Sequence, residues 1–288
     1  MEISGIKAFV AVAKYNSFSE AAKALRITQP AISKRIALLE GELAESLFDR
    51  VGRQVILTEA GDLLLPKCLG ILEAIEDTLI SLENLSGQVR GRLKIGTSHH
   101  IGLHHLPNYL REFSQKYPEA NLDIQFLGSE EITDLVEKGD LELGVITLPN
   151  ELPSNLFSRE LWNDELVFVA GRTHPLAKSK EISLSELSSY DALLPEENTF
   201  TREIVERAFN KNKLRLRTKL NSNYLETLKM LTSVGLGWSV LPNTMLDKEL
   251  IKLNTKNIKL TRKLGYIQNK NRTLSNAAIA MTGLLSHN

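Results

Sequence analysis

Four of the six histidines in this chain fall in one short stretch, at His99, His100, His104 and His105. His100 and His104 are four residues apart, and this spacing places two imidazoles on one face of a helix, where they can bind a transition metal. The same stretch contains no carboxylate or thiolate that would complete a tetrahedral set of ligands. We therefore favour a structural or ligand-contacting role for these histidines and assign no metal, with a metal-responsive protein as the alternative.

A second set of residues suits contact with nucleic acid. Amide, hydroxyl and basic side chains can bind phosphate oxygens and the base edges in the major groove of DNA. On a helix predicted to begin near residue 29, the outward face carries Gln29, Pro30, Ser33, Lys34 and Arg35. Between residues 20 and 40 the chain has four basic residues and no acidic one, namely Lys23, Arg26, Lys34 and Arg35. In an isolated helix such basic residues would simply be solvated. The neighbouring elements therefore determine whether this face is interpreted as a DNA-binding surface.

The elements around this face predict a helix-turn-helix. Ser17 and Glu20 match a capping box, in which the hydroxyl and the carboxylate reciprocally bind backbone N–H groups at a helix start. Thr28 can cap the next helix, and Pro30 fits the first turn, where its missing N–H group removes no intrahelical bond. The inward positions of that helix are apolar: Ile32, Ile36 and Leu39. Two short helices joined by a few residues are typical of a unit whose second helix enters the major groove.

Residues 47–58 predict a β-hairpin beside that helix. Two short extended runs flank Gly52, and Arg50 and Arg53 lie near the tip. An arginine at such a tip can reach phosphates or the minor groove, whereas the simpler interpretation is a solvated loop. With the preceding helices, the hairpin predicts a winged helix-turn-helix.

A long helix is predicted from Glu59 onward. Pro66 removes one backbone hydrogen bond and is expected to bend it. Its apolar residues repeat at intervals of three and four, the pattern of a coiled coil: Leu65, Cys68, Leu72, Ile75, Leu79 and Leu82. An apolar stripe outside a compact domain needs a partner, so we predict a homodimer through this helix. For Cys68, apolar packing is expected rather than redox chemistry.

Beyond residue 88 the pattern changes to alternating strands and helices. In the first set, strands are predicted over 92–96, 122–127 and 143–146, with helices over 103–117 and 130–137. A second set begins near Trp162, with strands over 166–170 and 238–241 and helices over 201–210 and 225–233. Strand–helix alternation favours parallel sheets, and the two sets predict two similar α/β lobes.

Composition and motifs disfavour several classes of protein. Lys+Arg and Asp+Glu both number 35, so the chain has no net positive charge that would indicate a polyanionic partner. One cysteine rules out an internal disulfide framework, and no run approaches the ~20 apolar residues of a membrane-spanning helix. The start of the chain lacks the pattern of a signal peptide. We therefore predict a cytoplasmic protein without a membrane partner, and not a solute-binding protein for transport.

An enzyme is likewise disfavoured. The run Gly235-Leu236-Gly237 lacks the third glycine and the preceding strand of a dinucleotide fingerprint, and a tight turn explains it better. The chain also has no phosphate-binding loop and no nucleophile elbow.

In combination, these motifs strongly resemble LysR-type transcriptional regulators. The resemblance rests on SFSEAA with Leu25, on TQPAIS from residue 28, on Leu47-Phe48 with Arg50, and on LTEAG from residue 57. It implies an α+β and α/β chain: an N-terminal winged helix-turn-helix over 1–58, a long linker helix over 59–90, and a two-lobed effector domain similar to periplasmic binding proteins over 91–288. Lobe I would hold residues 91–161 plus 266–288, and lobe II residues 162–265.

The resemblance implies a function in transcription. The partners would be double-stranded promoter DNA, a second copy in a dimer or tetramer, and RNA polymerase. The residue at position 34 is often arginine in relatives. Lys34 keeps the positive charge but lacks the two parallel N–H donors of a guanidinium, so a phosphate contact is favoured over a base contact. The residues predicted to contact DNA are Ser19, Thr28, Gln29, Pro30, Ser33, Lys34, Arg35, Arg50 and Arg53.

The resemblance also implies a small-molecule site between the lobes and no cofactor. Ser98 looks like the family's hydroxyl contact to a carboxylate or other oxyanion, so a small anionic metabolite is the expected effector. Arg202 is predicted either to face this cleft or to lie on the surface. The candidate effector-binding residues are Thr97, Ser98, His99, His100, Ile101, Thr147, Phe200, Thr201 and Arg202.

Overall fold

The computed structural model describes residues 1–51, 54–255 and 258–287. The chain forms two compact units, Met1–Ser86 and Gly87–Asn288. In the described residues, no helix is long and apolar enough to cross a membrane.

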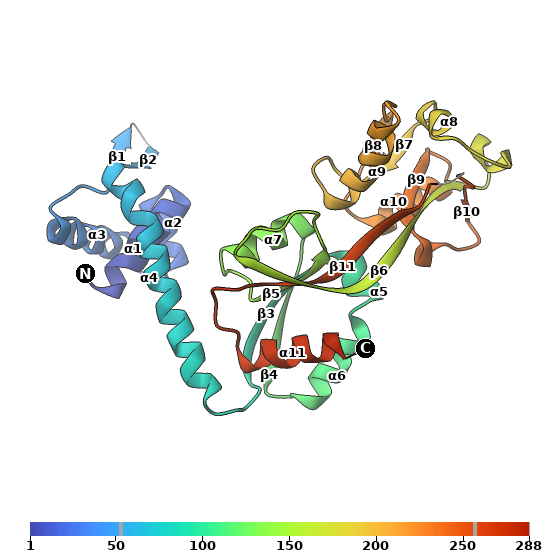
Figure 1. Ribbon diagram of the computed structural model, residues 1–288. Helices are drawn as coiled ribbons and strands as arrows, with labels where there is room; N and C mark the ends of the chain where they lie inside the picture. The colour runs from blue at the N-terminus through green and yellow to red at the C-terminus, as the bar shows by residue number, and fades with distance from the viewer. Residues whose placement is uncertain (52–53, 256–257, 288) are drawn as a thin grey trace. The chain divides into compact units, whose positions relative to one another are not determined.

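The first unit contains the predicted helix-turn-helix and hairpin (Figure 1). Helices α1 (Ile3–Tyr15), α2 (Phe18–Ala24) and α3 (Gln29–Leu43) precede an antiparallel pair, β1 (Phe48–Val51) and β2 (Gln54–Leu57). The inward residues predicted for α3, Ile32, Ile36 and Leu39, are buried and pack with Phe9 and Leu47. Burial of this apolar stripe turns the opposite, polar face of α3 outward.

The helix caps are partly as predicted. The Ser17 hydroxyl accepts the Glu20 N–H at 3.3 Å. The Glu20 carboxylate pairs with Lys23 at 2.8 Å, so it does not show the reciprocal capping bond that the sequence predicted. Thr28 occupies the N-cap position of α3 without a capping bond from its side chain, whereas Pro30 lies in the first turn as predicted.

Helix α4 (Glu59–Asn84) follows the hairpin, and the Thr58 hydroxyl caps it by accepting the Gly61 N–H at 3.1 Å. The predicted apolar stripe of α4 divides into two parts. Leu65, Cys68 and Leu72 pack against the core of the same unit, and Cys68 is fully buried there. Leu79 and Leu82 are 57% and 60% exposed. The prediction that Cys68 lies on a dimer surface is therefore wrong, because its own chain already covers it; burial also raises the pKa of its thiol.

The second unit is built on a nine-stranded sheet with the order β4-β3-β5-β11-β6-β9-β7-β8, with β10 (Leu250–Lys252) paired to β6. Strand β3 (Gly91–Thr97) pairs in parallel with β4 (Ala120–Phe126) and β5 (Leu143–Thr147). Strand β7 (Ala192–Leu194) pairs in parallel with β8 (Thr218–Asn221) and β9 (Trp238–Pro242). Each lobe thus has the predicted parallel strands.

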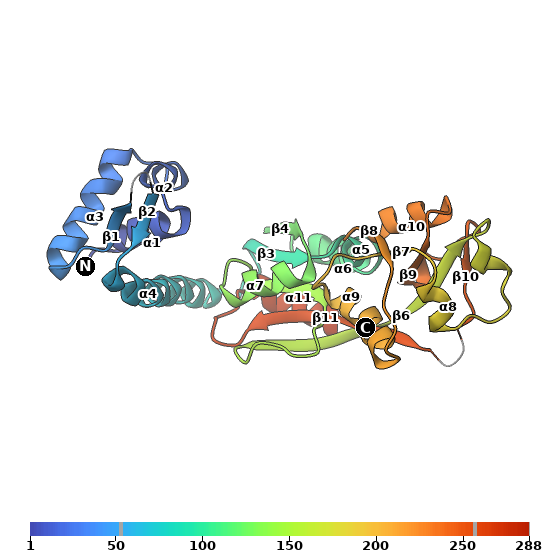
Figure 2. The same ribbon diagram turned by 90° about the horizontal axis from the view of Figure 1, so that it is seen from above.

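Two long antiparallel strands, β6 (Leu156–Gly171) and β11 (Leu260–Asn269), run through both lobes (Figures 1 and 2). The sequence predicted only residues 166–170 of β6, because Asn163, Asp164 and Glu165 resemble a polar break. At a bulge in β11, Gly265 lets the backbone of Arg159 approach more closely than a side chain would permit. The lobes are therefore joined by continuous strands, and not by loops alone.

Helices cover both faces of the sheet. In the first lobe α5 (His99–His104), α6 (Pro107–Lys116) and α11 (Asn276–Ser286) share one core, and α7 (Ser129–Glu137) covers the other face. In the second lobe α8 (Leu184–Ser188) and α9 (Phe200–Lys211) cover one face, and α10 (Leu225–Ser233) the other. Short 3-10 turns span Pro175–Lys178 and Asn243–Met245. The single helix predicted over 103–117 is wrong: α5 ends at His104 and α6 starts at Pro107, because proline favours a first turn over a helix interior.

The core of the first lobe includes Phe113, Leu264 and Met281, and Trp162 packs against it. The core of the second lobe includes Phe209 and Trp238, whose rings stack with centroids 5.8 Å apart. Trp162 and Leu264, which the sequence placed in lobe II, thus pack with the first lobe, since the continuous strands β6 and β11 carry both lobes.

Candidate functional site

The first candidate surface is the outward face of α3. Gln29, Pro30 and Lys34 are exposed, while Ser33 and Arg35 are half-buried. The Gln29 side-chain amide donates to the Ser33 hydroxyl at 3.1 Å, which restricts the amide before any partner binds. Ser19 on α2 and Thr28 at the start of α3 are also exposed. This face presents amide, hydroxyl and cationic groups of the kinds that contact DNA.

The wing residues can be placed only in part. Arg50 lies in β1, where it is paired with Val55 of β2. Its side chain and the whole of Arg53 lie outside the described residues.

The second candidate site is a cavity of about 410 Å³ within the second unit. Its walls come from the N-terminal turns of α5 and α7, from the start of α9, from the segment between β8 and α10, and from β11. The predicted residues that line it are Ser98, His99, His100, Thr147 and Thr201. The lining residues that the sequence did not predict include Ser129, Glu130, Asn221, Tyr224 and Arg262.

Four predicted residues lie outside the cavity lining, namely Thr97, Ile101, Phe200 and Arg202. Thr97 and Ile101 are fully buried, and the Thr97 hydroxyl donates to the Val145 carbonyl at 3.0 Å. The side chain of Phe200 borders a different hollow, and its backbone N–H donates to the Glu130 carboxylate. These residues shape the walls of the site rather than facing a ligand.

Both alternatives predicted for Arg202 are wrong. Its side chain is only 4% exposed and therefore does not lie on the surface, nor does it line the cavity. The guanidinium donates to Glu206 at 2.6 Å, to Thr218 at 2.8 Å and to Asn221 at 3.4 Å. Arg202 therefore lies behind the cavity and holds Asn221, which does line it.

The arginine that lines the cavity is Arg262, and not Arg202 as the sequence predicted. It is 5% exposed, and its Nε donates to the buried carboxylate of Asp164 at 2.7 Å. Its Nη1 donates to the Thr201 hydroxyl at 3.1 Å. Among the residues that the structure describes, its Nη2 has no hydrogen-bond partner. Burial lowers the pKa of Arg262 and the neighbouring Asp164 opposes this effect, so a cation is retained at the cavity wall.

Hydroxyl groups line the same cavity as this guanidinium. The Ser129 hydroxyl accepts the Thr147 N–H at 3.1 Å and keeps its own proton for another acceptor. The Ser98 hydroxyl caps α5 by accepting the Ile101 N–H at 3.5 Å, and it too keeps its proton. The carboxyl of Glu130 adds a hydrogen-bond acceptor to these donors. Burial raises the pKa of Glu130 above the usual value, whereas the Phe200 N–H lowers it. The cavity can therefore bind an oxyanion together with a neighbouring hydroxyl or protonated group.

The histidine cluster lies at the edge of the cavity. The ring of His99 contacts Phe126 and Tyr224, with centroids 5.2 and 4.7 Å away. His100 is 3% exposed, and its ring lies 4.7 Å from that of His104. Burial, with smaller contributions from Arg262, His104 and His105, lowers the pKa of His100 to about 2, so this imidazole is neutral at physiological pH.

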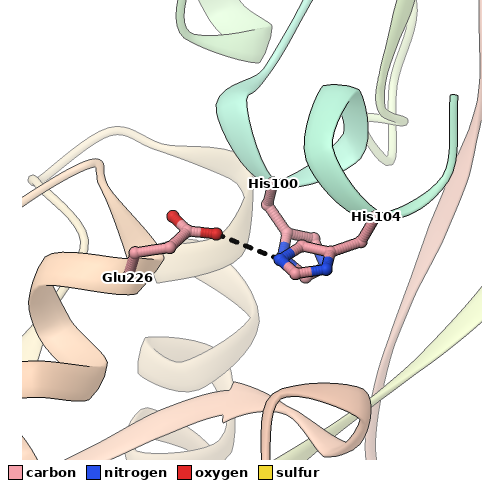
Figure 3. A group of neighbouring side chains, drawn as sticks. All are labelled: His100, His104 and Glu226. Carbon is pink, nitrogen blue, oxygen red and sulfur yellow. Dashed lines mark hydrogen bonds and ion pairs between the residues drawn. The ribbon is translucent and has the colours of Figure 1, made fainter. Parts of the chain in front are cut away.

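The chain brings a carboxylate to these histidines from a distant position. Glu226 on α10 lies 3.2 Å from the Nε2 atom of His104 on α5 (Figure 3). A carboxylate therefore lies beside the histidines in the folded chain. The sequence stretch contained none, and only the pairing of the two lobes brings Glu226 to the site.

The sequence matches family models along nearly all its length. Residues 3–62 match the bacterial regulatory helix-turn-helix protein model of the lysR family, and residues 86–288 match the LysR substrate binding domain. The chain therefore belongs to the LysR family of DNA-binding transcriptional regulators, with an effector-binding domain after the DNA-binding domain.

Individual relatives agree with this assignment. A probable RuBisCO transcriptional regulator from Cyanidium caldarium is 34% identical over 272 residues, which cover 91% of this chain and 86% of that protein. A crystal structure of full-length CbnR complexed with its target DNA is 20% identical with a TM-score of 0.63, and 99% of each chain is covered. The effector binding domain of QuiR in complex with shikimate is 18% identical with a TM-score of 0.62, over 68% of this chain and 95% of that one. These structures establish the fold, and the named sequence relative is described as a probable transcriptional regulator.

Proposed function

We propose that a small anion binds in the cavity and changes the affinity of this regulator for its promoter. The observation that carries the proposal is the buried Arg262, which has an N–H group without a partner among the described residues, beside a polar cavity. A buried donor without a partner costs free energy, and an oxyanion would satisfy it with a charge-assisted hydrogen bond. Shikimate, named in the QuiR complex, is a carboxylate of suitable class.

The lining residues suggest how such a ligand would bind. A carboxylate, phosphate or sulfur oxyanion would accept from Arg262, Ser98 and Ser129. Glu130 would accept a hydroxyl or amine of the same ligand. We therefore expect a small polyfunctional metabolite rather than a bare inorganic ion.

For DNA we propose that α3 enters the major groove, as the helix-turn-helix geometry requires. Gln29 would read base edges, and Lys34 would contact phosphate. CbnR, which has the same fold, forms a complex with its target DNA, and this supports DNA binding by the present chain. We expect the protein to act in the cytoplasm, where promoter DNA and RNA polymerase would be its partners.

We also propose a homodimer, with the exposed end of α4 as the contact. Ile75, Leu79 and Leu82 continue the apolar stripe beyond the part that packs against the same unit. Exposed leucines at this spacing are typical of a helix that pairs with a second copy. Two dimers would then form the tetramer expected for the family.

The pair of substitutions Leu79→Glu and Leu82→Glu should convert the dimer into a monomer at micromolar concentration. Two carboxylates would be buried without partners if the stripe remained paired. Size-exclusion chromatography with light scattering measures the mass. The matched control is Thr78→Glu with Ser81→Glu, which adds the same charge at exposed positions of the same helix and should leave the mass unchanged. A dimeric Leu79/Leu82 variant, or equal dissociation of the control, would exclude this interface.

A thermal-shift screen against small anions tests the effector proposal. At 100 times its dissociation constant, a ligand adds about 2.7 kcal/mol, roughly 5–10 °C in melting temperature for a domain of this size. Ser98→Ala should reduce that shift. Ser183→Ala is the matched control because Ser183 caps α8 in the same way and does not line the cavity. A set of neutral ligands that shift the protein while anions do not would contradict the proposal.

In the alternative function, metal binding itself is the signal. The observation in its favour is the group of His100, His104 and Glu226, so the screen includes divalent metals with the same two serine variants. A shift by metals alone that survives Ser98→Ala would favour this alternative.

A further inference from the structure

We propose that His100, His104 and Glu226 form a binding site for a divalent transition-metal ion of the zinc class. One ligand atom from each residue lies within 4.8 Å of the others. Ligand atoms about 2 Å from a tetrahedral ion are separated by about 3.3 Å, so small rotations of these side chains would complete the set. The site lies outside the anion contacts described above, and it does not require the anion to bind.

The strongest single observation is that the buried ring of His100 makes no hydrogen bond with the described residues. The residue is 3% exposed, yet neither ring nitrogen has a hydrogen-bond partner among the described residues. Buried polar atoms are nearly always satisfied, because an unpaired one costs free energy. Its ring faces His104 in Figure 3, on the side where Glu226 approaches. A metal ion at this point would give the buried nitrogen a partner.

The charges around the group also suit a metal. Glu226 supplies the negative charge, and its 3.2 Å contact holds the His104 ring in place. The nearby cation Arg262 is balanced by the carboxylate of Asp164, which reduces its repulsion of an incoming ion.

The donor set indicates the class of ion. Two imidazole nitrogens and one carboxylate oxygen favour zinc, copper or nickel over magnesium and calcium, which prefer oxygen ligands. Three protein ligands leave a position for water or an exogenous ligand. Because α5 belongs to the first lobe and α10 to the second, the ion would cross-link the lobes at one edge of the cavity.

Isothermal titration of the full-length, EDTA-treated protein with ZnSO₄ tests the site, with Co²⁺ absorption as a second readout of ligand geometry. The wild type should bind about one Zn²⁺ per chain at this site. His104→Gln and Glu226→Gln should each weaken that binding at least tenfold and reduce the visible Co²⁺ bands. His287→Gln and Glu249→Gln, exposed residues outside the group, are the matched controls and should bind as the wild type does.

Absence of saturable Zn²⁺ binding to the wild type would overturn the proposal, as would unchanged affinity in both His104→Gln and Glu226→Gln. Circular dichroism of each variant verifies that it is folded, and His104 and Glu226 are partly exposed, so their replacement leaves the core intact. The anion screen is repeated in EDTA, so failure of the metal site leaves the test of the proposed effector unaffected.

Discussion

Replacement of Arg262 by methionine should destabilise the effector domain by about 3–5 kcal/mol, because it leaves a buried carboxylate without its partner. The side chains of Arg262 and Asp164 are 4% and 3% exposed, and their ion pair spans 2.7 Å between β11 and β6. Methionine keeps much of the side-chain volume, so the loss of charge dominates the effect. Urea unfolding followed by tryptophan fluorescence measures it in the full chain, since both tryptophans lie in the second unit.

Two further variants identify the cause. Arg262→Met combined with Asp164→Leu should recover most of the lost stability, because a neutral pair replaces the isolated charge. Lys263→Met is the control: Lys263 pairs with Glu160 at 2.7 Å, but its side chain is 66% exposed. Breaking that surface pair should change the free energy of unfolding by less than about 1 kcal/mol. Equal losses in Lys263→Met and Arg262→Met would show that burial of the pair is unimportant.

Removal of the Gln29 side chain should relax the base preference of the regulator. A bidentate amide contact distinguishes the correct base by about 1–3 kcal/mol, and the bond from Gln29 to Ser33 holds the amide ready on α3. Gln29→Ala should therefore lose affinity for the selected promoter site and little for random DNA. Fluorescence anisotropy on both DNAs at several salt concentrations gives the comparison.

Lys34→Ala should behave differently on the same DNAs. Loss of one phosphate contact should weaken binding to every sequence and lower the slope of log affinity against log salt by about one. Lys138→Ala, which removes an exposed charge from the effector domain, is the matched control. Gln29 does not read bases if Gln29→Ala loses equal affinity for both DNAs. Lys34 does not contact phosphate if Lys34→Ala keeps the wild-type salt slope.

The helices before α4 could be predicted well from the sequence because their signals are local. The spacing of Ile32, Ile36 and Leu39 fixed the buried face of α3, and Pro30 marked its start. The same reasoning went wrong on α4, where Leu65, Cys68 and Leu72 meet a core formed by residues far earlier in the chain. Periodicity identifies an apolar face but not what covers it.

The effector cavity could be predicted only on the walls that family motifs mark. Ser98 and Thr201 follow from motif positions, whereas Arg262 looked like one of several basic residues near the end of the chain. Its role depends on Asp164, ninety-eight positions away, in a strand that the sequence left unassigned. The approach of Glu226 to His104 is equally non-local, and no pattern within either helix indicated it.

Control of DNA binding by a small anion in the cavity can be measured on the full-length protein. The affinity for a promoter fragment selected from genomic DNA is compared at one salt concentration, with and without the anion found by the thermal-shift screen. We predict a change in affinity of at least about fivefold, or a footprint of different length, and neither change in Ser98→Ala. An anion that binds the cavity but leaves both affinity and footprint unchanged would show that the cavity does not control DNA binding.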